Sequence, residues 1–159
     1  LLMSHITYVQ GDATAPVGAG PKIIVHVCND VGGWGRGFVL ALSERWPEPE
    51  ASYRSWHRDS ETNDFGLGAA QLVPVEPDLW VANVVGQEGI VANEAGPPVR
   101  YWAIEAGLAV VAGEAEAMSA SVHMPRIGCG LAGGAWPVVE AIIERTLVTN
   151  RVSVVVYDL

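Results

Sequence analysis

Two glycine-rich loops are the parts of this chain whose residue types and spacing could do chemistry. The second glycine loop (residues 124–137) follows the apolar run Ser121 to Met124, contains four glycines and leads into a helical pattern that begins near Trp136. Glycine lets backbone N–H groups approach an anion closely, and a helix N-terminus adds unpaired donors and the positive end of a dipole. The loop is therefore predicted to bind phosphate, with a positive φ expected at Gly130.

The first glycine loop (residues 27–37) repeats this arrangement earlier in the chain. It follows the apolar run Ile23 to Val27 and precedes another helical pattern. Asn29 and Asp30 stand near its start, and Asp30 is the only carboxylate in either loop. Two glycine loops at strand ends indicate a ligand with an extended, phosphate-bearing body.

Cysteine and histidine side chains offer a competing chemistry, which the sequence does not favour. Cys28 and Cys129 lie in the two loops, where a helix N-terminus would lower the pKa of a thiol. Neither has an obvious base beside it in the sequence, so both are interpreted as small packing residues. His26 lies inside an apolar run and is predicted to be buried and hydrogen-bonded. No spacing of His, Cys and carboxylates is typical of a metal site, and no cofactor is predicted.

Length and composition are consistent with one globular domain. The chain has 159 residues, half of them hydrophobic, so we predict a single domain over residues 3–159. Leu1 and Leu2, which precede Met3, are set aside as foreign to it. No apolar run approaches the roughly 20 residues of a membrane span, and the start of the chain lacks the features of a secretory signal. With two cysteines and no disulfide framework, the sequence predicts a cytoplasmic protein.

The charge balance argues against nucleic acid as a ligand. The formal net charge is −9, and the chain contains a single lysine, Lys22. A broad grip on a phosphate backbone requires clustered Lys and Arg. The phosphates of any ligand must then be held mainly by backbone N–H groups and helix ends, which favours a small nucleotide over a polymer.

An alternation of strands and helices is expected to position the loops. Strands are predicted at Ile6–Gln10, Ile23–Val27, Ala69–Val75, Leu79–Val85, Ser121–Met124 and Arg151–Tyr157. Helices are predicted at Gly37–Trp46, Pro47–Arg58, Pro97–Met118 and Trp136–Val148. The strands are nearly continuous apolar runs, which is typical of an α/β fold with both sheet faces covered and ligands beyond the carboxyl ends of the strands. In the longest helix, small and apolar residues are predicted to share one face: Val99, Ala103, Ala106, Val110, Gly113 and Ala117.

Four segments together resemble the macrodomain family, the α/β/α modules that bind ADP-ribose. They are Ile6 to Asp12, His26 to Gly37, Met124 to Leu131 and Val156 to Leu159, so the resemblance covers nearly the whole chain. Within the family, the run Pro-Arg-Ile-Gly-Cys-Gly-Leu resembles the sequences of one subgroup, which contains the terminal ADP-ribose protein glycohydrolase and its bacterial relatives. The resemblance implies a three-layer α/β/α sandwich around a mixed, mostly parallel sheet. It also implies ADP-ribose or ADP-ribosylated proteins as partners.

The resemblance further implies where the parts of ADP-ribose would lie. Asp12 would accept a hydrogen bond from the adenine amino group, and Tyr157 would lie beside the adenine. The distal ribose would be wrapped by Asn29, Asp30, Gly33, Trp34, Gly35 and Arg36, and the diphosphate by Gly128, Cys129, Gly130 and Leu131. Residue types alone leave alternatives: Asp12 could cap a turn, Trp34 could pack back on the domain and Tyr157 could be an aromatic at the core edge. Arg36 could pair with Asp30 instead of a ligand.

A departure from the subgroup decides the expected chemistry. The eukaryotic glycohydrolase uses a lysine nucleophile and an aspartate acid/base, at positions that Gly86 and Ala132 occupy here. Lys22 precedes the second strand, on the wrong side of the sheet. Hydrolysis of an ADP-ribose ester on a glutamate or aspartate side chain would then use a positioned water, with Asn29 and Asp30 as the candidate catalytic residues.

Two other functions remain open at this point. A module that reads ADP-ribose without turning it over would also lack both catalytic residues of the glycohydrolase. A hydrolase of another ADP-ribose ester, such as O-acetyl-ADP-ribose or ADP-ribose 1″-phosphate, would carry the same two loops.

Overall fold

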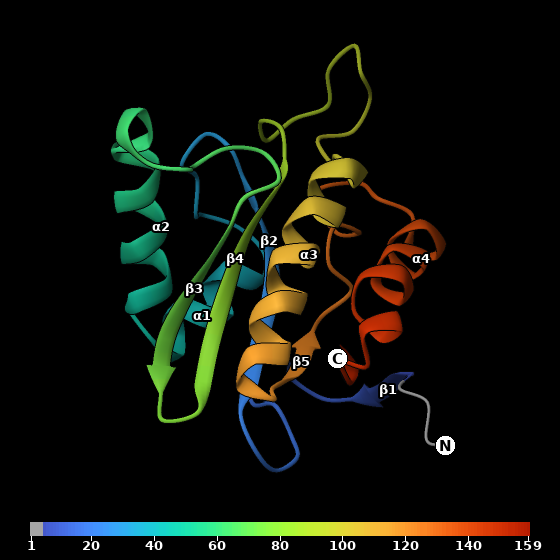
Figure 1. The fold of residues 1–159 in the computed structure, drawn as a ribbon. Coiled ribbons are helices and arrows are strands. Elements are labelled where there is room, and N and C mark those ends of the chain that lie inside the picture. Colours follow the sequence, from blue (N-terminus) through green and yellow to red (C-terminus); the bar gives the residue numbers. More distant parts are fainter. Residues whose placement is uncertain (1–4) are drawn as a thin grey trace.

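The computed structural model describes residues 5–159 and contains a six-stranded sheet with helices on both sides (Figure 1). The strands are β1 (Ile6–Gln10), β2 (Lys22–Asn29), β3 (Ala70–Glu76), β4 (Leu79–Gln87), β5 (Ser121–Met124) and β6 (Val154–Asp158). The helices are α1 (Phe38–Arg45), α2 (Glu48–Arg58), α3 (Tyr101–Met118) and α4 (Trp136–Thr146), with 3-10 turns at Ser60–Thr62 and Val148–Asn150. The predicted exclusion of Leu1 and Leu2 concerns residues outside the described range.

The sheet is mixed and mostly parallel, as the resemblance implied. Its strand order is β1-β6-β5-β2-β4-β3, and only β3 runs antiparallel to its neighbour. The turn between β3 and β4 contains Asp78 with a φ of 60°. Because the other strands are parallel, their carboxyl ends meet at one edge of the sheet, and both glycine loops leave from that edge.

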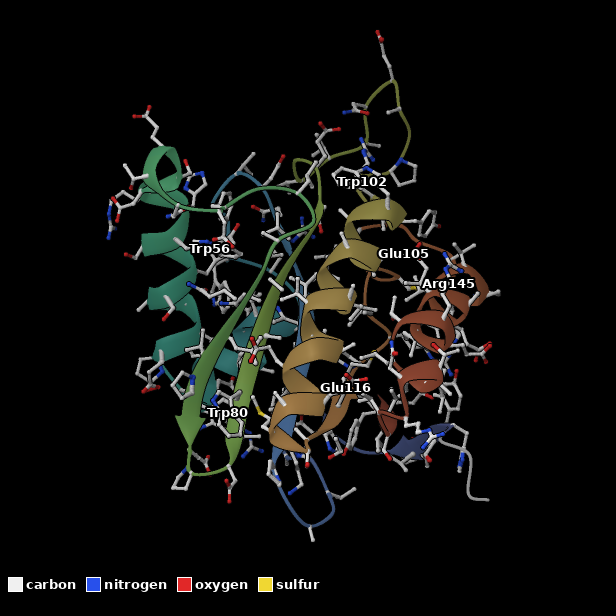
Figure 2. All side chains as sticks on the ribbon, viewed as in Figure 1. Trp56, Trp80, Trp102, Glu105, Glu116 and Arg145 are labelled. Atoms are coloured by element: carbon white, nitrogen blue, oxygen red, sulfur yellow. The ribbon has the colours of Figure 1, made fainter. Side chains whose placement is uncertain are left out.

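A layer of helices covers each face of the sheet. α1 and α2 pack on one face, and α3 and α4 pack on the other (Figure 1). On β2, Ile23 and Val25 join the core beneath α3 and α4, whereas Ile24 joins the core beneath α1 and α2. An ion pair between Arg145 Nη2 and Glu105 Oε1, at 2.8 Å, links α4 to α3 (Figure 2). The predicted three-layer fold is confirmed, and burial of β2 on both faces explains its continuous apolar run.

The longest helix starts later than the spacing predicted. α3 begins at Tyr101 rather than at Pro97. Val99 forms an antiparallel bridge with Gln87, so residues 97–100 run back along the end of β4 before the helix begins. A proline also disfavours helical backbone in the residue before it, and this sequence has two in succession, Pro97 and Pro98.

α3 also buries a different face from the predicted one. Of the predicted residues, Val99 and Ala103 are buried, and the others are exposed: Ala106, Val110, Gly113 and Ala117. The buried residues of the helix are Ala103, Ile104, Gly107, Leu108, Val111, Ala112 and Ala115. A Cβ on Gly107 would lie 2.4 Å from Cγ1 of Val84, so the helix approaches β4 most closely at this glycine. Apolar residues surround nearly the whole helix, and spacing alone could not select the face.

The last helix starts where it was predicted, and the last strand starts three residues later than predicted. α4 ends at Thr146. Its predicted inward residues are buried: Val139, Ile142, Thr146 and Leu147. β6 begins at Val154 instead of Arg151, because Arg151 adopts a φ of 63° that ends the preceding 3-10 turn. Among residues 5–159, no helix is both long and apolar enough to cross a membrane.

Candidate functional site

The second glycine loop turns tightly and leaves one glycine facing open space. Gly128 and Gly133 have φ values of 71° and 78°, in the region that favours glycine. The N–H of Gly134 donates to the Gly128 carbonyl at 2.7 Å, and a Cβ on Gly134 would lie 2.4 Å from that oxygen. The expected positive φ at Gly130 is wrong, because its neighbours make the turn. A Cβ on Gly130 would meet no atom within 4 Å.

Backbone N–H groups without acceptors lie in both glycine loops. Within residues 5–159, the N–H groups of Gly130, Leu131 and Ala132 have no hydrogen-bond partner, and α4 beyond them has no side-chain cap. In the first glycine loop the same holds for the N–H groups of residues 34–37, and α1 has no side-chain cap at Gly37. Such groups are ready donors for an anion.

The two glycine loops lie next to each other. A Cβ on Gly37 would lie 3.6 Å from Cδ1 of Leu131, whose side chain is mostly exposed. The loops follow β2 and β5, which pair directly in the sheet. The two sets of uncommitted N–H groups therefore lie on adjoining loops, an arrangement suited to a ligand with neighbouring phosphates.

Asn29, a candidate catalytic residue, organises the first glycine loop. Its Oδ1 accepts hydrogen bonds from the N–H groups of Val31 and Gly33, both at 3.0 Å. Its Nδ2 donates to the Gly33 carbonyl, also at 3.0 Å. The hydroxyl of Tyr53 lies 2.9 Å from the same Oδ1. These bonds engage both ends of the amide, so Asn29 holds the loop in shape.

Asp30 joins the first glycine loop to the β4–α3 loop (residues 88–100). Its Oδ1 accepts a hydrogen bond from the N–H of Gly89 at 2.8 Å. Its other carboxylate oxygen has no partner within residues 5–159. Next to Gly89, Cδ1 of Ile90 lies 3.2 Å from the position of a Cβ on Gly33, so the two loops are packed together. Asp30 thus holds one loop to the other and keeps one oxygen for a further interaction.

Trp34 packs back on the domain, which was one of its two predicted alternatives. Its side chain is 4% exposed, and its Nε1 donates to Ser43 Oγ at 2.8 Å. Its ring lies against His26 and Tyr53, with centroids 5.3 and 5.4 Å away.

Arg36 is exposed and forms no ion pair or hydrogen bond with residues 5–159, so its pairing with a loop carboxylate is not found.

Asp12 closes a turn and keeps an exposed face. Its Oδ1 accepts hydrogen bonds from the N–H and the hydroxyl of Thr14, at 2.8 and 2.7 Å. Its Oδ2 lies 3.8 Å from Arg45 Nη2. The Thr14 hydrogen bonds first, and then the Arg45 charge, hold the pKa of the Asp12 carboxyl below its usual value. The side chain is 44% exposed, so the turn-capping role leaves Oδ2 accessible.

Tyr157 is an aromatic residue at the edge of the core, as its residue type alone allowed. Its hydroxyl accepts a hydrogen bond from the Val17 N–H at 2.9 Å, which leaves its hydrogen for Nδ1 of His123, 2.7 Å away. Burial raises the pKa of the Tyr157 hydroxyl. A Cβ on Gly11 would lie 3.6 Å from the Tyr157 ring. Tyr157 therefore ties the segment after β1 to the sheet.

The cysteines are not activated as nucleophiles. Cys28 is buried and Cys129 is half-buried, and burial raises the pKa of both thiols. His26 lies 3.7 Å from Cys28 Sγ, a contact that sequence reasoning missed although residues two apart on a strand share a face. Burial lowers the pKa of His26 to about 4, and the ring bonds to Asn83 as a buried histidine should. In residues 5–159 no three His, Cys, Asp or Glu side chains gather to hold a metal ion.

No lysine occupies the carboxyl edge where the glycohydrolase nucleophile would lie. A Cβ on Gly86 would lie 2.8 Å from Cγ1 of Ile104 and 3.1 Å from Cγ1 of Val27, so a side chain does not fit there without movement. Ala132 is buried. Lys22 is the first residue of β2, at the opposite edge of the sheet.

Solved structures of high similarity match nearly the whole chain, although no protein-family model matches it. A macrodomain protein from Streptomyces coelicolor is 57% identical, with a TM-score of 0.87 over 98% of this chain and 99% of that chain. A protein of unknown function from Bacteroides thetaiotaomicron is 55% identical, with a TM-score of 0.95 and the same coverage. The macrodomain of Mycobacterium tuberculosis DarG is 25% identical, with a TM-score of 0.75 over 98% and 99% of the two chains.

Curated proteins of two kinds are also similar. The chromodomain-helicase-DNA-binding protein 1-like of Danio rerio is 34% identical over 96% of this chain. The chain spans only 15% of that protein and 18% of its Mus musculus counterpart. The ADP-ribose 1″-phosphate phosphatase of Meyerozyma guilliermondii is 24% identical over 96% of this chain and 100% of its own length.

Proposed function

The chain belongs to the macrodomain family, and from this premise we propose that it binds ADP-ribose and hydrolyses the ester that joins ADP-ribose to an acidic side chain. The observation that carries the proposal is the proximity of two glycine loops, each with N–H groups that have no acceptor within residues 5–159. Two adjoining sets of donors suit a diphosphate. The phosphatase relatives act, by their name, on a phosphate ester of ADP-ribose.

In this proposal the ligand lies along the carboxyl edge of the sheet. The diphosphate sits between residues 34–37 and residues 130–132. The distal ribose lies on the first glycine loop, beside Gly33 and Asp30, and the adenine lies toward Asp12. The exposed Oδ2 of Asp12 is then the acceptor for the adenine amino group. A phosphate site made of backbone N–H groups needs no cluster of Lys and Arg side chains. Such a site is consistent with a chain that has a net charge of −9 and a single lysine.

The proposed reaction needs little from the protein beyond positioning. Water adds at the anomeric carbon of the distal ribose, and the bond from that carbon to the ester oxygen breaks. The products are ADP-ribose, the free side-chain carboxylate and a proton. We assign the unpaired carboxylate oxygen of Asp30 to orient the water and accept its proton, whereas Asn29 holds the loop that carries Asp30.

A reader of ADP-ribose is the rival function, and one observation favours it. Asn29 uses both ends of its amide inside the loop, and Asp30 uses one oxygen to hold Gly89. Groups engaged in this way support binding without chemistry. A hydrolase of ADP-ribose 1″-phosphate is the third candidate, which the phosphatase relatives favour by name.

We expect the protein to release ADP-ribose from a glutamate-linked substrate and to leave a serine-linked substrate intact. A carboxylate leaves readily because its parent acid has a pKa of about 4, whereas a serine alkoxide needs a general acid. Ala132 supplies no such acid. Chromatography of released ADP-ribose on both substrates, beside calorimetry with free ADP-ribose, separates the functions. Tight binding with no release over hours would identify a reader, and consumption of the 1″-phosphate alone would identify a phosphatase.

Asp30→Asn and Asp30→Ala separate the two uses of the Asp30 carboxylate. Asparagine keeps an oxygen for the Gly89 N–H but cannot accept the proton, so we expect kcat to fall about 10- to 100-fold with little change in affinity. Alanine also releases Gly89, so we expect ADP-ribose affinity to fall as well. Glu94→Gln, which removes an exposed carboxylate from the β4–α3 loop, is the matched control. Full activity in Asp30→Asn would leave Asp30 with the loop-holding role alone.

A further inference from the structure

Three side chains of helix α2 lie against Gly32 in the first glycine loop: Tyr53, Arg54 and His57. The buried Tyr53 hydroxyl accepts a hydrogen bond from the Gly32 N–H at 3.1 Å. Arg54 Nη1 donates to the Gly32 carbonyl at 3.0 Å. A Cβ on Gly32 would lie 2.6 Å from Nδ1 of His57, so only glycine lets the loop lie this close to the helix. The N–H and the carbonyl of Gly32 are thus both hydrogen-bonded to side chains of α2.

Tyr53 also holds the start of the loop. Its hydroxyl lies 2.6 Å from the Asn29 carbonyl oxygen and 2.9 Å from Asn29 Oδ1, and its hydrogen can be donated to either. Together, Tyr53 and Asn29 satisfy the N–H groups of Val31, Gly32 and Gly33. A run of uncommitted N–H groups begins at Trp34, directly after these three held residues.

Helix α2 is itself fixed to the sheet by two polar side chains, the buried Asn83 and the half-buried Gln71. Asn83 Nδ2 donates to the Pro49 carbonyl at 3.2 Å and to Gln71 Oε1 at 3.0 Å. Gln71 Nε2 in turn donates to the Ser52 carbonyl at 3.2 Å. Because Asn83 uses its amide nitrogen for these bonds, its Oδ1 accepts from Nε2 of His26 at 2.5 Å. The helix that carries Tyr53 is anchored along its first half, so it offers a fixed reference for the loop.

We propose that Tyr53 is a positioning residue for the distal-ribose half of the site, acting through Gly32 and Asn29. This inference rests on the proposed function, because that function places the distal ribose on the first glycine loop. Without the hydroxyl, the Gly32 N–H loses its acceptor and turns toward water or the ligand. Gly33 and Asp30, which the proposed function places beside the distal ribose, then lose their fixed position, whereas the buried Trp34, bonded to Ser43, still holds the start of residues 34–37. Tyr53 touches the loop and not the ligand, so its effect depends on which part of the ligand the loop meets.

The test compares ADP-ribose with ADP in Tyr53→Phe, because the two ligands differ by the distal ribose. We expect ADP-ribose affinity to fall about 5- to 10-fold, the effect of one lost buried hydrogen bond, while ADP affinity stays within about 2-fold. Calorimetry measures both affinities, and thermal unfolding measures Tm. Trp56→Phe is the matched control on the same helix (Figure 2), because it removes the 2.8 Å hydrogen bond from Nε1 to Asp64 away from the site. The control should leave the ratio of the two affinities unchanged.

Each outcome decides the proposal. Equal affinities in Tyr53→Phe and the wild type would show that Tyr53 serves core packing alone. An equal loss for both ligands, with a lowered Tm, would show general destabilisation and would overturn the positioning role as well. A wild type that binds neither ligand would instead refute the proposed function. Should Tyr53→Phe fail to fold, Arg54→Ala removes the contact to the Gly32 carbonyl from an exposed position, and a selective loss of ADP-ribose affinity is again expected.

Discussion

Gly130→Glu is expected to remove ADP-ribose binding from a protein that still folds. Gly130 adopts no positive φ, and a Cβ there would meet no atom within 4 Å, so the folded chain has room for the side chain. The same side chain would enter the space in front of the uncommitted N–H groups of residues 130–132. Its charge would also repel a diphosphate. We expect affinity to fall about 100-fold or more, equivalent to about 2.8 kcal/mol, by calorimetry.

Gly113→Glu is the matched control for this variant. Gly113 is exposed on α3, and a Cβ there would likewise meet no atom within 4 Å. Both variants add one negative charge to the protein. A difference in ADP-ribose affinity between them therefore reports the local effect at Gly130 and not long-range repulsion. Unchanged ADP-ribose affinity in a folded Gly130→Glu protein would show that the second glycine loop is a structural turn and not a phosphate site.

The free energy of unfolding is expected to fall steeply as the pH drops from about 6.5 to about 4. Burial is the main cause that lowers the pKa of both His26 and His123 from 6.5 to about 4, and Lys22 adds to the effect at His123. The unfolded chain therefore takes up these protons before the folded protein does. The contribution of each histidine to the free energy of unfolding is complete above the pKa of the unfolded chain. As the pH falls from that value to the pKa of the folded protein, up to about 3 kcal/mol is lost for each histidine.

Urea unfolding at a series of pH values measures this loss. His123→Gln should reduce the slope between pH 6.5 and 4 by about half, because one of two titrating groups is gone. The carboxyl groups of Asp12 and Asp158 have lowered pKa values and contribute in a separate window, as the pH falls further through their folded pKa values. A free energy of unfolding that stays constant from pH 6.5 to 4 would mean that both histidines are solvated in the folded protein.

The fold was largely predictable because its signals are local. Strand Ser121–Met124 and the start of α4 at Trp136 match their predictions, since apolar runs and glycine punctuation mark them directly. The face of α3 was not predictable. It depends on the close approach of Gly107 to Val84 on a distant strand, which no helical spacing records.

The place of the candidate loops in the fold could be predicted from the sequence, but the hydrogen-bond partners of their side chains could not. The glycine loops and the exposed Asp12 lie where parallel strands end, as the sequence indicated. Asn29 and Asp30, however, accept hydrogen bonds from Tyr53 and Gly89, which belong to other parts of the fold. Nothing in the sequence around Tyr53 distinguishes it from any other buried aromatic on a helix. Roles that depend on such partners become visible only in three dimensions.

The proposed diphosphate site needs both sets of N–H donors, and these sets, which include Gly37 and Leu131, come from opposite halves of the chain. They meet only after β5 has paired with β2, which closes a long loop of intervening chain. Contacts of such wide sequence separation form slowly, so the phosphate site cannot precede the assembly of the central sheet. A partly folded chain would then have no affinity for the ligand. Excess ADP-ribose would accordingly favour the complete native state over every intermediate, and would raise its apparent stability by mass action.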